Sequence, residues 1–164
     1  MWGQGVLPNH SVLDLGIEPS DNMAEIARSH GIETMCGIAE NLPLPDSSFD
    51  FVLMVTAICF FDDVKKAFQE AYKVIQNDSF IVVAFIDRNS RLGILYEKLK
   101  NGNLFYKDAT FYSIQNVTDM LSHAGFSGFE YKQTIYSTEN ILNEVKDGYG
   151  DGGFVVIKAF KRKS

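Results

Sequence analysis

An acidic residue follows the first apolar stretch of the chain. Residues 12–17 form a short apolar run interrupted by one acid, and Glu18-Pro19 ends it, which predicts a buried strand that reaches a turn. A carboxylate at the end of such a strand can accept hydrogen bonds from both hydroxyls of a ribose. An acid in this position also serves as an ordinary turn or cap residue. Taken alone, Glu18 is therefore a candidate for nucleotide binding and for a purely local role.

No metal site or catalytic triad is predicted. Cys36 and Cys59 do not form a Cys-x-x-Cys pair, and the three histidines are scattered along the chain, so neither a disulfide framework nor a zinc site is indicated. The glycine-rich residues 148–153 lack the preceding strand and following helix of a phosphate-binding loop. We interpret them as a flexible entry to the next strand.

Strands and helices alternate along the sequence. Strands are predicted at residues 12–18, 32–36, 49–55, 80–86, 129–136 and 154–160. Helices are predicted to begin after caps at Ser20, at Asp62 or Asp63, and at Ser113. The aromatic segment 91–108 shows no clear helical or strand periodicity in its apolar residues and is interpreted as a lid. This order predicts an α/β fold with a mostly parallel sheet, helices on both faces and an antiparallel C-terminal strand.

Length and charge limit the domain organisation and the kinds of partner that the chain could have. The 164 residues, of which 46% are hydrophobic, suit a single domain spanning residues 1–164. The formal charge of −6 repels phosphate backbones, so no nucleic-acid partner is expected. The basic end, residues 158–163, is expected to be solvated. Without an apolar run of ~20 residues or a signal peptide, we expect a cytoplasmic protein with no membrane partner.

Long segments of the sequence follow one another in a distinctive order. They are VLDLG, GIEPSDNMAEIA, GIAENLPLPDSSFDFVLMV, FDDVKKAFQEAYKVI and SIQNVTDMLSHAGF. In order and spacing they resemble the small-molecule class I S-adenosylmethionine-dependent methyltransferases (methyltransferase type 11), over nearly all of the chain from Val12 onward. The resemblance implies a Rossmann-like fold and S-adenosylmethionine as cofactor.

The resemblance also implies where the cofactor would bind. The positions that match the family's cofactor-binding residues are Asp14, Gly16, Glu18, Ala39, Glu40, Leu42, Thr56 and Ile58. Among these, Glu18 corresponds to the ribose-binding acid. The family's usual Asp before the matching alanine is Ile38 here, which leaves Glu40 or a backbone carbonyl to contact the adenine amino group.

The sequence departs from the family at the first cofactor motif. In dinucleotide-type folds the ribose acid lies roughly 20 residues past the glycine turn, whereas Gly16 precedes Glu18 by two positions. Because parallel neighbours need a crossover of about a dozen residues, VLDLG and GIEPS are predicted to form one strand. Either the glycine turn with its helix is deleted at Gly16, or residues 3–5 are a remnant of it; the segment LPNHSVLDLG favours deletion.

A shortened motif has physical consequences. The glycine turn lets backbone N–H groups approach the cofactor closely, so its loss predicts weaker binding. It also predicts uncovered sheet edges or helix faces, which favour self-association, for example as a homo-dimer.

The expected activity is methyl transfer from S-adenosylmethionine to a small-molecule acceptor. Such a reaction needs few catalytic side chains, because the sulfonium already activates the methyl group. The side chains that could hold an acceptor lie in loops at or near the strand ends: Asp87, Arg88, Tyr96, Tyr106 and Tyr149. The alternative is a catalytically inactive, truncated domain that binds cofactor poorly or serves only in association. A nicotinamide-dependent oxidoreductase would need a GxGxxG turn before the acid, which the sequence lacks.

Overall fold

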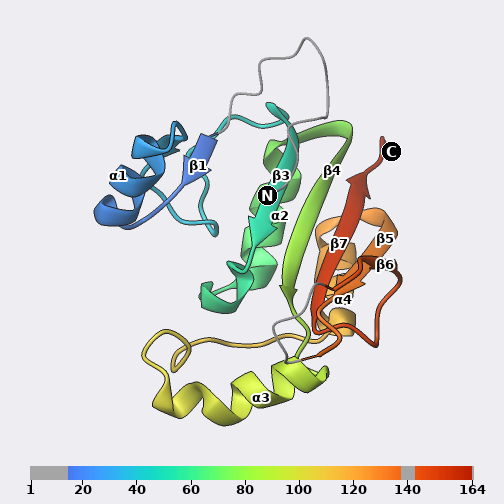
Figure 1. Ribbon diagram of the computed structural model, residues 1–164. Helices are drawn as coiled ribbons and strands as arrows, with labels where there is room; N and C mark the ends of the chain where they lie inside the picture. The colour runs from blue at the N-terminus through green and yellow to red at the C-terminus, as the bar shows by residue number, and fades with distance from the viewer. Residues whose placement is uncertain (1–14, 138–142, 164) are drawn as a thin grey trace. The chain divides into compact units, whose positions relative to one another are not determined.

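The computed structural model describes residues 15–137 and 143–163 (Figure 1). The chain divides into two compact units, an N-terminal unit, Met1–Ile38, and a C-terminal unit, Ala39–Ser164. Each has its own sheet, of two strands in the first and five strands in the second.

The N-terminal unit is a strand, a helix and a parallel strand. Strand β1 (Leu15–Ile17) pairs with β2 (Glu33–Met35), so the two sequence segments around Gly16 do form one strand, as predicted. Helix α1 (Asp21–Ser29) connects them, and the Oγ of Ser20 accepts a hydrogen bond from the Met23 N–H at 3.5 Å. The predicted cap at Ser20 is therefore confirmed.

The C-terminal unit contains a mixed sheet in the order β3-β4-β7-β5-β6. Strand β3 (Phe49–Val55) pairs in parallel with β4 (Ile75–Ile86), and β4 pairs antiparallel with β7 (Phe154–Lys161). Strand β5 (Ser127–Thr134) is antiparallel to both β7 and the short β6 (Lys146–Asp147). The α/β fold and its antiparallel C-terminal strand are thus confirmed, and the five-stranded sheet is mixed, with β3 and β4 as its parallel pair.

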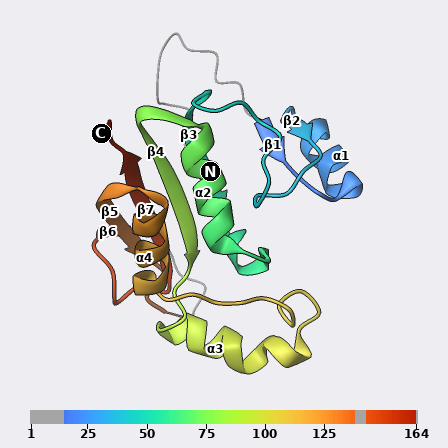
Figure 2. The same ribbon diagram turned by 180° about the vertical axis from the view of Figure 1, so that it is seen from behind.

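Two helices cover one face of this sheet (Figure 2). They are α2 (Val64–Val74), capped by Asp63, and α4 (Ile114–Ala124), which begins with a capping box at Ser113 and ends at Gly125 in the left-handed conformation. Apolar side chains of both helices, including the fully buried Phe68 and Leu121, pack on the inward residues of β4 and β7. This packing forms the hydrophobic core.

The opposite side of β3 carries large apolar side chains that remain exposed. Phe51, Leu53 and Val55 are 42%, 58% and 47% exposed. A strand of seven residues, almost all apolar, predicts burial on both faces. In the structure, alternate residues of β3 point away from the helix-covered face, which explains why only Val52 and Met54 join the core.

A third helix lies in a segment whose apolar residues show no helical periodicity in the sequence. Helix α3 (Arg91–Leu99) follows the Ser90 cap and continues into the short helix η2 (Lys100–Gly102). Interpreting the segment only as an irregular lid missed this helix. Its apolar residues do not form a single inward stripe: Ile94, Leu95 and Leu99 are 39–58% exposed, so the helical period is masked.

The basic end of the chain is not simply solvated. Lys161 is 8% exposed, and its Nζ donates hydrogen bonds to the carbonyl oxygens of Tyr72 and Ile75 at 2.8 and 2.7 Å. Lys158 lies over the rings of Phe80 and Phe160. The expectation of a solvated terminus was therefore wrong for both lysines, because they lie on β7, which pairs with β4 on one side and with β5 on the other.

Among the helices of the described residues, none is long and apolar enough to cross a membrane.

Candidate functional site

The carboxyl ends of β3 and β4 meet at a strained residue. Thr56 follows β3 with a φ of 53°, in the left-handed region that β-branched residues rarely adopt. Its N–H donates to the Ala84 carbonyl oxygen at 2.8 Å, and its Oγ1 donates to the Val55 carbonyl oxygen at 2.8 Å. The neighbouring strand thus holds Thr56 in this conformation. Backbone strain of this kind concentrates at ligand-binding sites.

A small cavity opens beside Thr56. Its volume is about 30 Å³, and its walls come from the strand ends, the short helix η1 (Ile58–Phe60) and the segment before α4. The lining residues are Thr56, Ile58, Cys59, Phe85, Ile86, Tyr106, Thr110, Phe111 and Tyr112. Such a volume holds about one water molecule, so a larger ligand would have to displace part of the wall.

Aromatic rings from three parts of the chain form one wall of the cavity and the surface beside it. The Tyr106 ring lies 5.1 Å from Tyr96 and 6.0 Å from Phe111 between centroids, and it stacks with Phe60 at 6.3 Å. Tyr96 also lies 6.0 Å from Phe111. We call these four residues the aromatic cluster. Of the residues predicted to hold an acceptor, the structure brings Tyr96 and Tyr106 together here.

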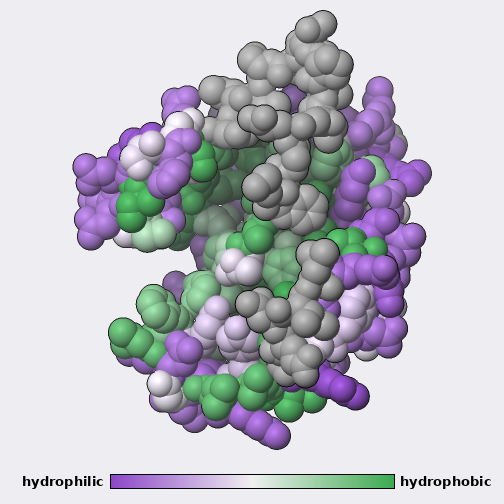
Figure 3. All heavy atoms as spheres, viewed as in Figure 1, coloured by the Kyte–Doolittle hydropathy of each residue, from purple (hydrophilic) through white to green (hydrophobic). Residues whose placement is uncertain are grey.

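Backbone hydrogen bonds hold the cluster against η1. The Thr110 N–H donates to the Cys59 carbonyl oxygen at 2.8 Å. The Lys100 Nζ donates to the Ala109 carbonyl oxygen at 3.2 Å, closing the loop between η2 and Thr110. Hydrophobic residues lie on the surface of this loop and of α3 among hydrophilic ones (Figure 3), and Leu104 and Phe105 are each 79% exposed.

The polar groups of the cavity are neutral at physiological pH. Burial raises the pKa of the Cys59 thiol from 9.0 to about 11. Burial also raises the pKa of Tyr106, with Tyr96 and Cys59 adding to the effect. The pKa of Tyr112 is raised by burial, by Cys59 and by the Asp63 carboxylate. Because lysine, arginine and histidine are absent from the lining, this environment disfavours negative charge.

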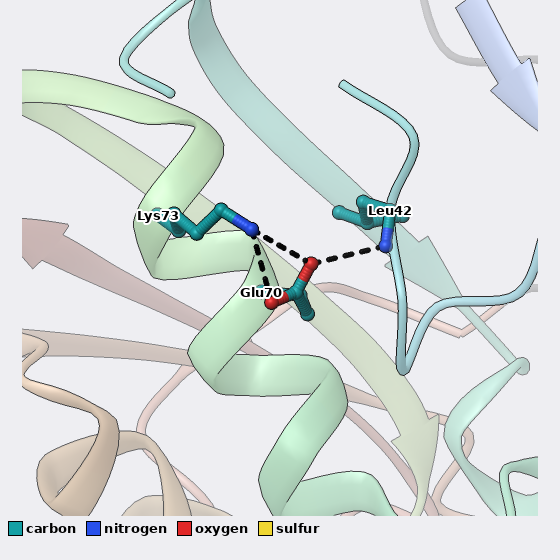
Figure 4. A network of polar contacts seen from close by, with 3 residues as sticks. All are labelled: Leu42, Glu70 and Lys73. Carbon is teal, nitrogen blue, oxygen red and sulfur yellow. Dashed lines mark hydrogen bonds and ion pairs between the residues drawn. The ribbon is translucent and has the colours of Figure 1, made fainter. Parts of the chain in front are cut away.

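The loop after Ile38 is tied to α2 at several points. The Glu40 Oε1 accepts hydrogen bonds from the Asp62 and Asp63 N–H groups at 2.9 and 3.3 Å, at the start of α2. Further along, the Glu70 Oε2 accepts a hydrogen bond from the Leu42 N–H at 3.0 Å, and the same carboxylate pairs with Lys73 (Figure 4). These contacts fix the course of the predicted adenine-bordering loop at Glu40 and Leu42, directly after Ala39.

The remaining predicted cofactor residues lie in the N-terminal unit. Glu18 follows β1, where its Oε1 accepts a hydrogen bond from the Ser20 N–H at 2.9 Å. Gly16 lies inside β1, and a Cβ there would come no closer than 3.4 Å to Thr34 Cγ2, an ordinary contact. The geometry of the strand therefore does not itself require glycine at this position. Asp14 lies outside the described residues.

The other predicted acceptor residues have local contacts. Asp87 is 5% exposed and forms the turn after β4, where its carbonyl oxygen accepts a hydrogen bond from the Ser90 Oγ at 2.7 Å. Arg88 is exposed and donates its N–H to the Tyr112 carbonyl oxygen at 3.0 Å. Tyr149 packs against Tyr131 at 4.8 Å between centroids. None of the three lines the cavity beside Thr56.

The glycine-rich turn before β7 is fixed by one buried side chain. Gln133 is 5% exposed, and its Oε1 accepts hydrogen bonds from the Asp151 and Gly152 N–H groups at 3.0 and 2.7 Å. These hydrogen bonds tie the predicted strand entry to β5. A shallow hollow of about 170 Å³ adjoins this turn and is lined in part by Arg91, Asp151 and Gly153. Within the described residues, no cluster of histidine, cysteine or acidic side chains could hold a metal.

Several residues of the site were missed by sequence reasoning. They are Phe60, Phe111 and Tyr112 around the cavity, and Glu70 beneath the Leu42 loop. Adjacent aromatic residues at 60–61 and 111–112 were the available signal, since both pairs flank predicted helix caps. Glu70 carried no such signal, because an acid on an amphipathic helix usually faces solvent.

Comparisons with known protein families, sequences and structures identify relatives of this chain. The family described as "Methyltransferase domain" matches residues 8–83. The crystal structure of an S-adenosylmethionine-dependent methyltransferase from Thermotoga maritima, named as a possible histamine N-methyltransferase, is 47% identical. Its similarity covers 90% of this chain and 72% of that chain, with a TM-score of 0.87.

Two relatives known from sequence match most of this chain, with different degrees of identity. An uncharacterized protein of Methanocaldococcus jannaschii is 40% identical over 151 residues, which are 91% of this chain and 74% of the relative. An uncharacterized protein of Mycobacterium tuberculosis is 27% identical over 88% of this chain, and the match spans about half (53%) of that relative's length.

Proposed function

The chain belongs to the S-adenosylmethionine-dependent methyltransferases, and we propose that it transfers a methyl group from this cofactor to a small-molecule acceptor held at the carboxyl ends of β3 and β4. The observation that carries the proposal is the strained Thr56 beside a cavity lined by apolar and neutral polar side chains. Ligands of open α/β sheets bind at this edge. The likeness to the Thermotoga structure supports the cofactor assignment.

The described residues offer groups that suit the parts of the cofactor. The Glu18 carboxylate, directly after β1, suits the two ribose hydroxyls. Thr56 and Ile58 stand at the end of β3 and suit the methionine end. When bound, the cofactor supplies a methyl group that its sulfonium already activates. The chain then has to bind the cofactor and the acceptor, align them and exclude water.

The loop at residues 39–42 is the proposed border of the adenine. Because the Oε1 of Glu40 already accepts two backbone N–H groups at the start of α2, we assign the adenine contact to the other carboxylate oxygen of Glu40 or to a backbone carbonyl of this loop. The Leu42 N–H is bound to Glu70, which leaves the loop's course independent of the ligand.

The acceptor side is assigned to Tyr96 and Tyr106 of the aromatic cluster. Asp87 supports this wall indirectly through the turn into α3. The name of the Thermotoga protein makes histamine one acceptor for a screen. Methylated products would be identified by mass spectrometry.

Titration calorimetry with S-adenosylhomocysteine tests the cofactor site. We expect micromolar binding that weakens at least tenfold in Glu18→Ala, while Glu25→Ala, an exposed acid on α1, binds like the original chain. Circular dichroism establishes that all three proteins are folded. Absence of binding by the folded original chain would contradict the proposal and support the alternative, an inactive methyltransferase-like domain.

A further inference from the structure

Exposed apolar side chains gather on the outer side of α3 and on the loop that follows it. With about 3.6 residues per turn, Ile94, Leu95 and Leu99 fall on one side of the helix, and they are 46%, 39% and 58% exposed. The loop adds Leu104 and Phe105, each 79% exposed. We call these five residues the apolar patch. Single apolar residues on a surface are ordinary, whereas a contiguous group marks a site of interaction.

Packing on the inner side of α3 holds the apolar patch outward. Gly93 lies on the side opposite the patch, and it is so close to the turn after β4 that a Cβ would overlap the Asp87 carbonyl oxygen. Tyr96 is on the same inner side, and its ring lies 6.0 Å from that of Phe111 between centroids. Figures 1 and 2 show α3 and its loop beyond the carboxyl ends of β3 and β4. The helix therefore cannot rotate to bury the patch against this sheet.

Two basic residues lie on the same outer side of α3 as the apolar patch. Arg91 and Lys98 are exposed, and neither forms an ion pair with another described residue. Lys100 and Lys107, by contrast, pair with acids of their own segment. Residues 91–108 carry a net charge of +2 in a chain whose formal charge is −6. Because charges are screened beyond roughly 8 Å at about 0.15 M salt, this local charge governs what the patch meets.

We propose that the apolar patch docks the chain reversibly on an anionic lipid surface. Leucine and phenylalanine side chains enter the boundary between headgroups and acyl chains, while Arg91 and Lys98 reach the headgroup phosphates. Leu104 and Phe105 stand out from a loop, a shape that suits insertion into a bilayer better than contact with a flat protein surface. The expectation of no membrane partner rested on the lack of a spanning segment and a signal peptide, and a helix that lies on the surface needs neither.

Sedimentation of the full chain with lipid vesicles tests the docking. One preparation contains phosphatidylglycerol and phosphatidylcholine in equal parts, and the other contains phosphatidylcholine alone. At about 0.15 M salt we expect roughly tenfold tighter binding to the anionic vesicles, since each basic residue near such a surface contributes about fivefold. At about 1 M salt the screening length falls to roughly 3 Å, so the difference between the two preparations should largely disappear.

Two matched pairs of variants locate the binding to the apolar patch. Phe105→Ser should weaken binding to the anionic vesicles about fivefold or more, whereas Leu53→Ser, at an apolar position of β3 that is 58% exposed, should not. Lys98→Glu should weaken it about tenfold. Lys65→Glu, at an exposed position of α2, alters the net charge equally and should have little effect. Circular dichroism establishes that all four variants are folded.

Several results would overturn the inference. They are no binding to the anionic vesicles, equal binding to both preparations, or equal losses within either pair of variants. Analytical ultracentrifugation without lipid tests the competing occupant: a dimer that Phe105→Ser dissociates would assign the apolar patch to a second copy of the chain and contradict lipid docking. The vesicle measurements contain no S-adenosylhomocysteine, so their result does not depend on the proposed methyl transfer.

Discussion

The Glu70 carboxylate accepts a hydrogen bond from the backbone N–H of Leu42 at 3.0 Å, although the two residues are 28 positions apart in the chain. The Glu70 side chain is 16% exposed, and it also pairs with the more exposed Lys73. The Glu70 side chain on α2 thereby holds the loop at Leu42, in addition to the contacts of Glu40 with the start of α2.

Glu70 is expected to position the Leu42 loop. Glu70→Ala should lower the free energy of unfolding by about 1 kcal/mol, because it removes a charged acceptor from a partly buried N–H. It should also weaken S-adenosylhomocysteine binding about fivefold and speed hydrogen exchange at the Leu42 amide. Glu70→Gln, which retains an acceptor oxygen, should keep most of the stability and most of the S-adenosylhomocysteine binding. Lys73→Ala removes only the half-exposed ion pair and should change little; an equal effect of Lys73→Ala would contradict this role.

Cys59 should react slowly with thiol reagents. Burial raises its pKa from 9.0 to about 11, and only the thiolate reacts. At pH 8, iodoacetamide should modify Cys59 at least tenfold more slowly than the exposed Cys36, with both sites followed by peptide mass spectrometry. The rate at Cys59 should rise with pH up to about 11, and denaturing urea should abolish the difference between the sites.

The same shift has a defined effect on stability. Because the folded state holds the proton of Cys59 more tightly than the unfolded state, this stabilising contribution is fully present below pH 9 and is lost as the pH rises through about 11. Cys59→Ser should therefore show a shallower loss of stability across this range in urea unfolding. An identical slope would show that the thiol contributes nothing.

Gly93 should not tolerate a side chain. A Cβ at this position would overlap the Asp87 carbonyl oxygen and lie 2.8 Å from the Arg88 Cα, and both are backbone atoms that cannot move aside cheaply. Gly93→Ala should lower the free energy of unfolding by about 2 kcal/mol or more. Gly102→Ala is the control, since a Cβ there meets nothing within 4 Å; its thermal midpoint should be unchanged or slightly raised.

Lys161 should stabilise the end of α2. Its Nζ donates to the Tyr72 and Ile75 carbonyl oxygens, which have few other donors near a helix C-terminus. Lys161→Met should keep the packing volume but lower the free energy of unfolding by about 1–3 kcal/mol, as measured by urea unfolding. Lys163→Met, an exposed neighbour, should have almost no effect. Comparable losses in the two variants would mean that general charge matters more than these hydrogen bonds.

The sequence alone determined the elements whose signals are local. The strand at Phe49–Val55 follows from an unbroken β-prone run, and the helices after Ser20, Asp63 and Ser113 follow from cap residues with an apolar period behind them. The family also followed from the order of long segments. These features depend on neighbours within a few positions, so the one-dimensional pattern contains them.

The tertiary structure decided what distant segments do together. The aromatic cluster joins residues 60, 96, 106 and 111. In the sequence, each of these aromatic residues looked like an ordinary core residue. Lys161 looked like a solvated charge until strand pairing carried it beneath α2. Burial, charge neighbours and the strain at Thr56 depend on which strand ends meet, and that contact is fixed only when the whole sheet forms.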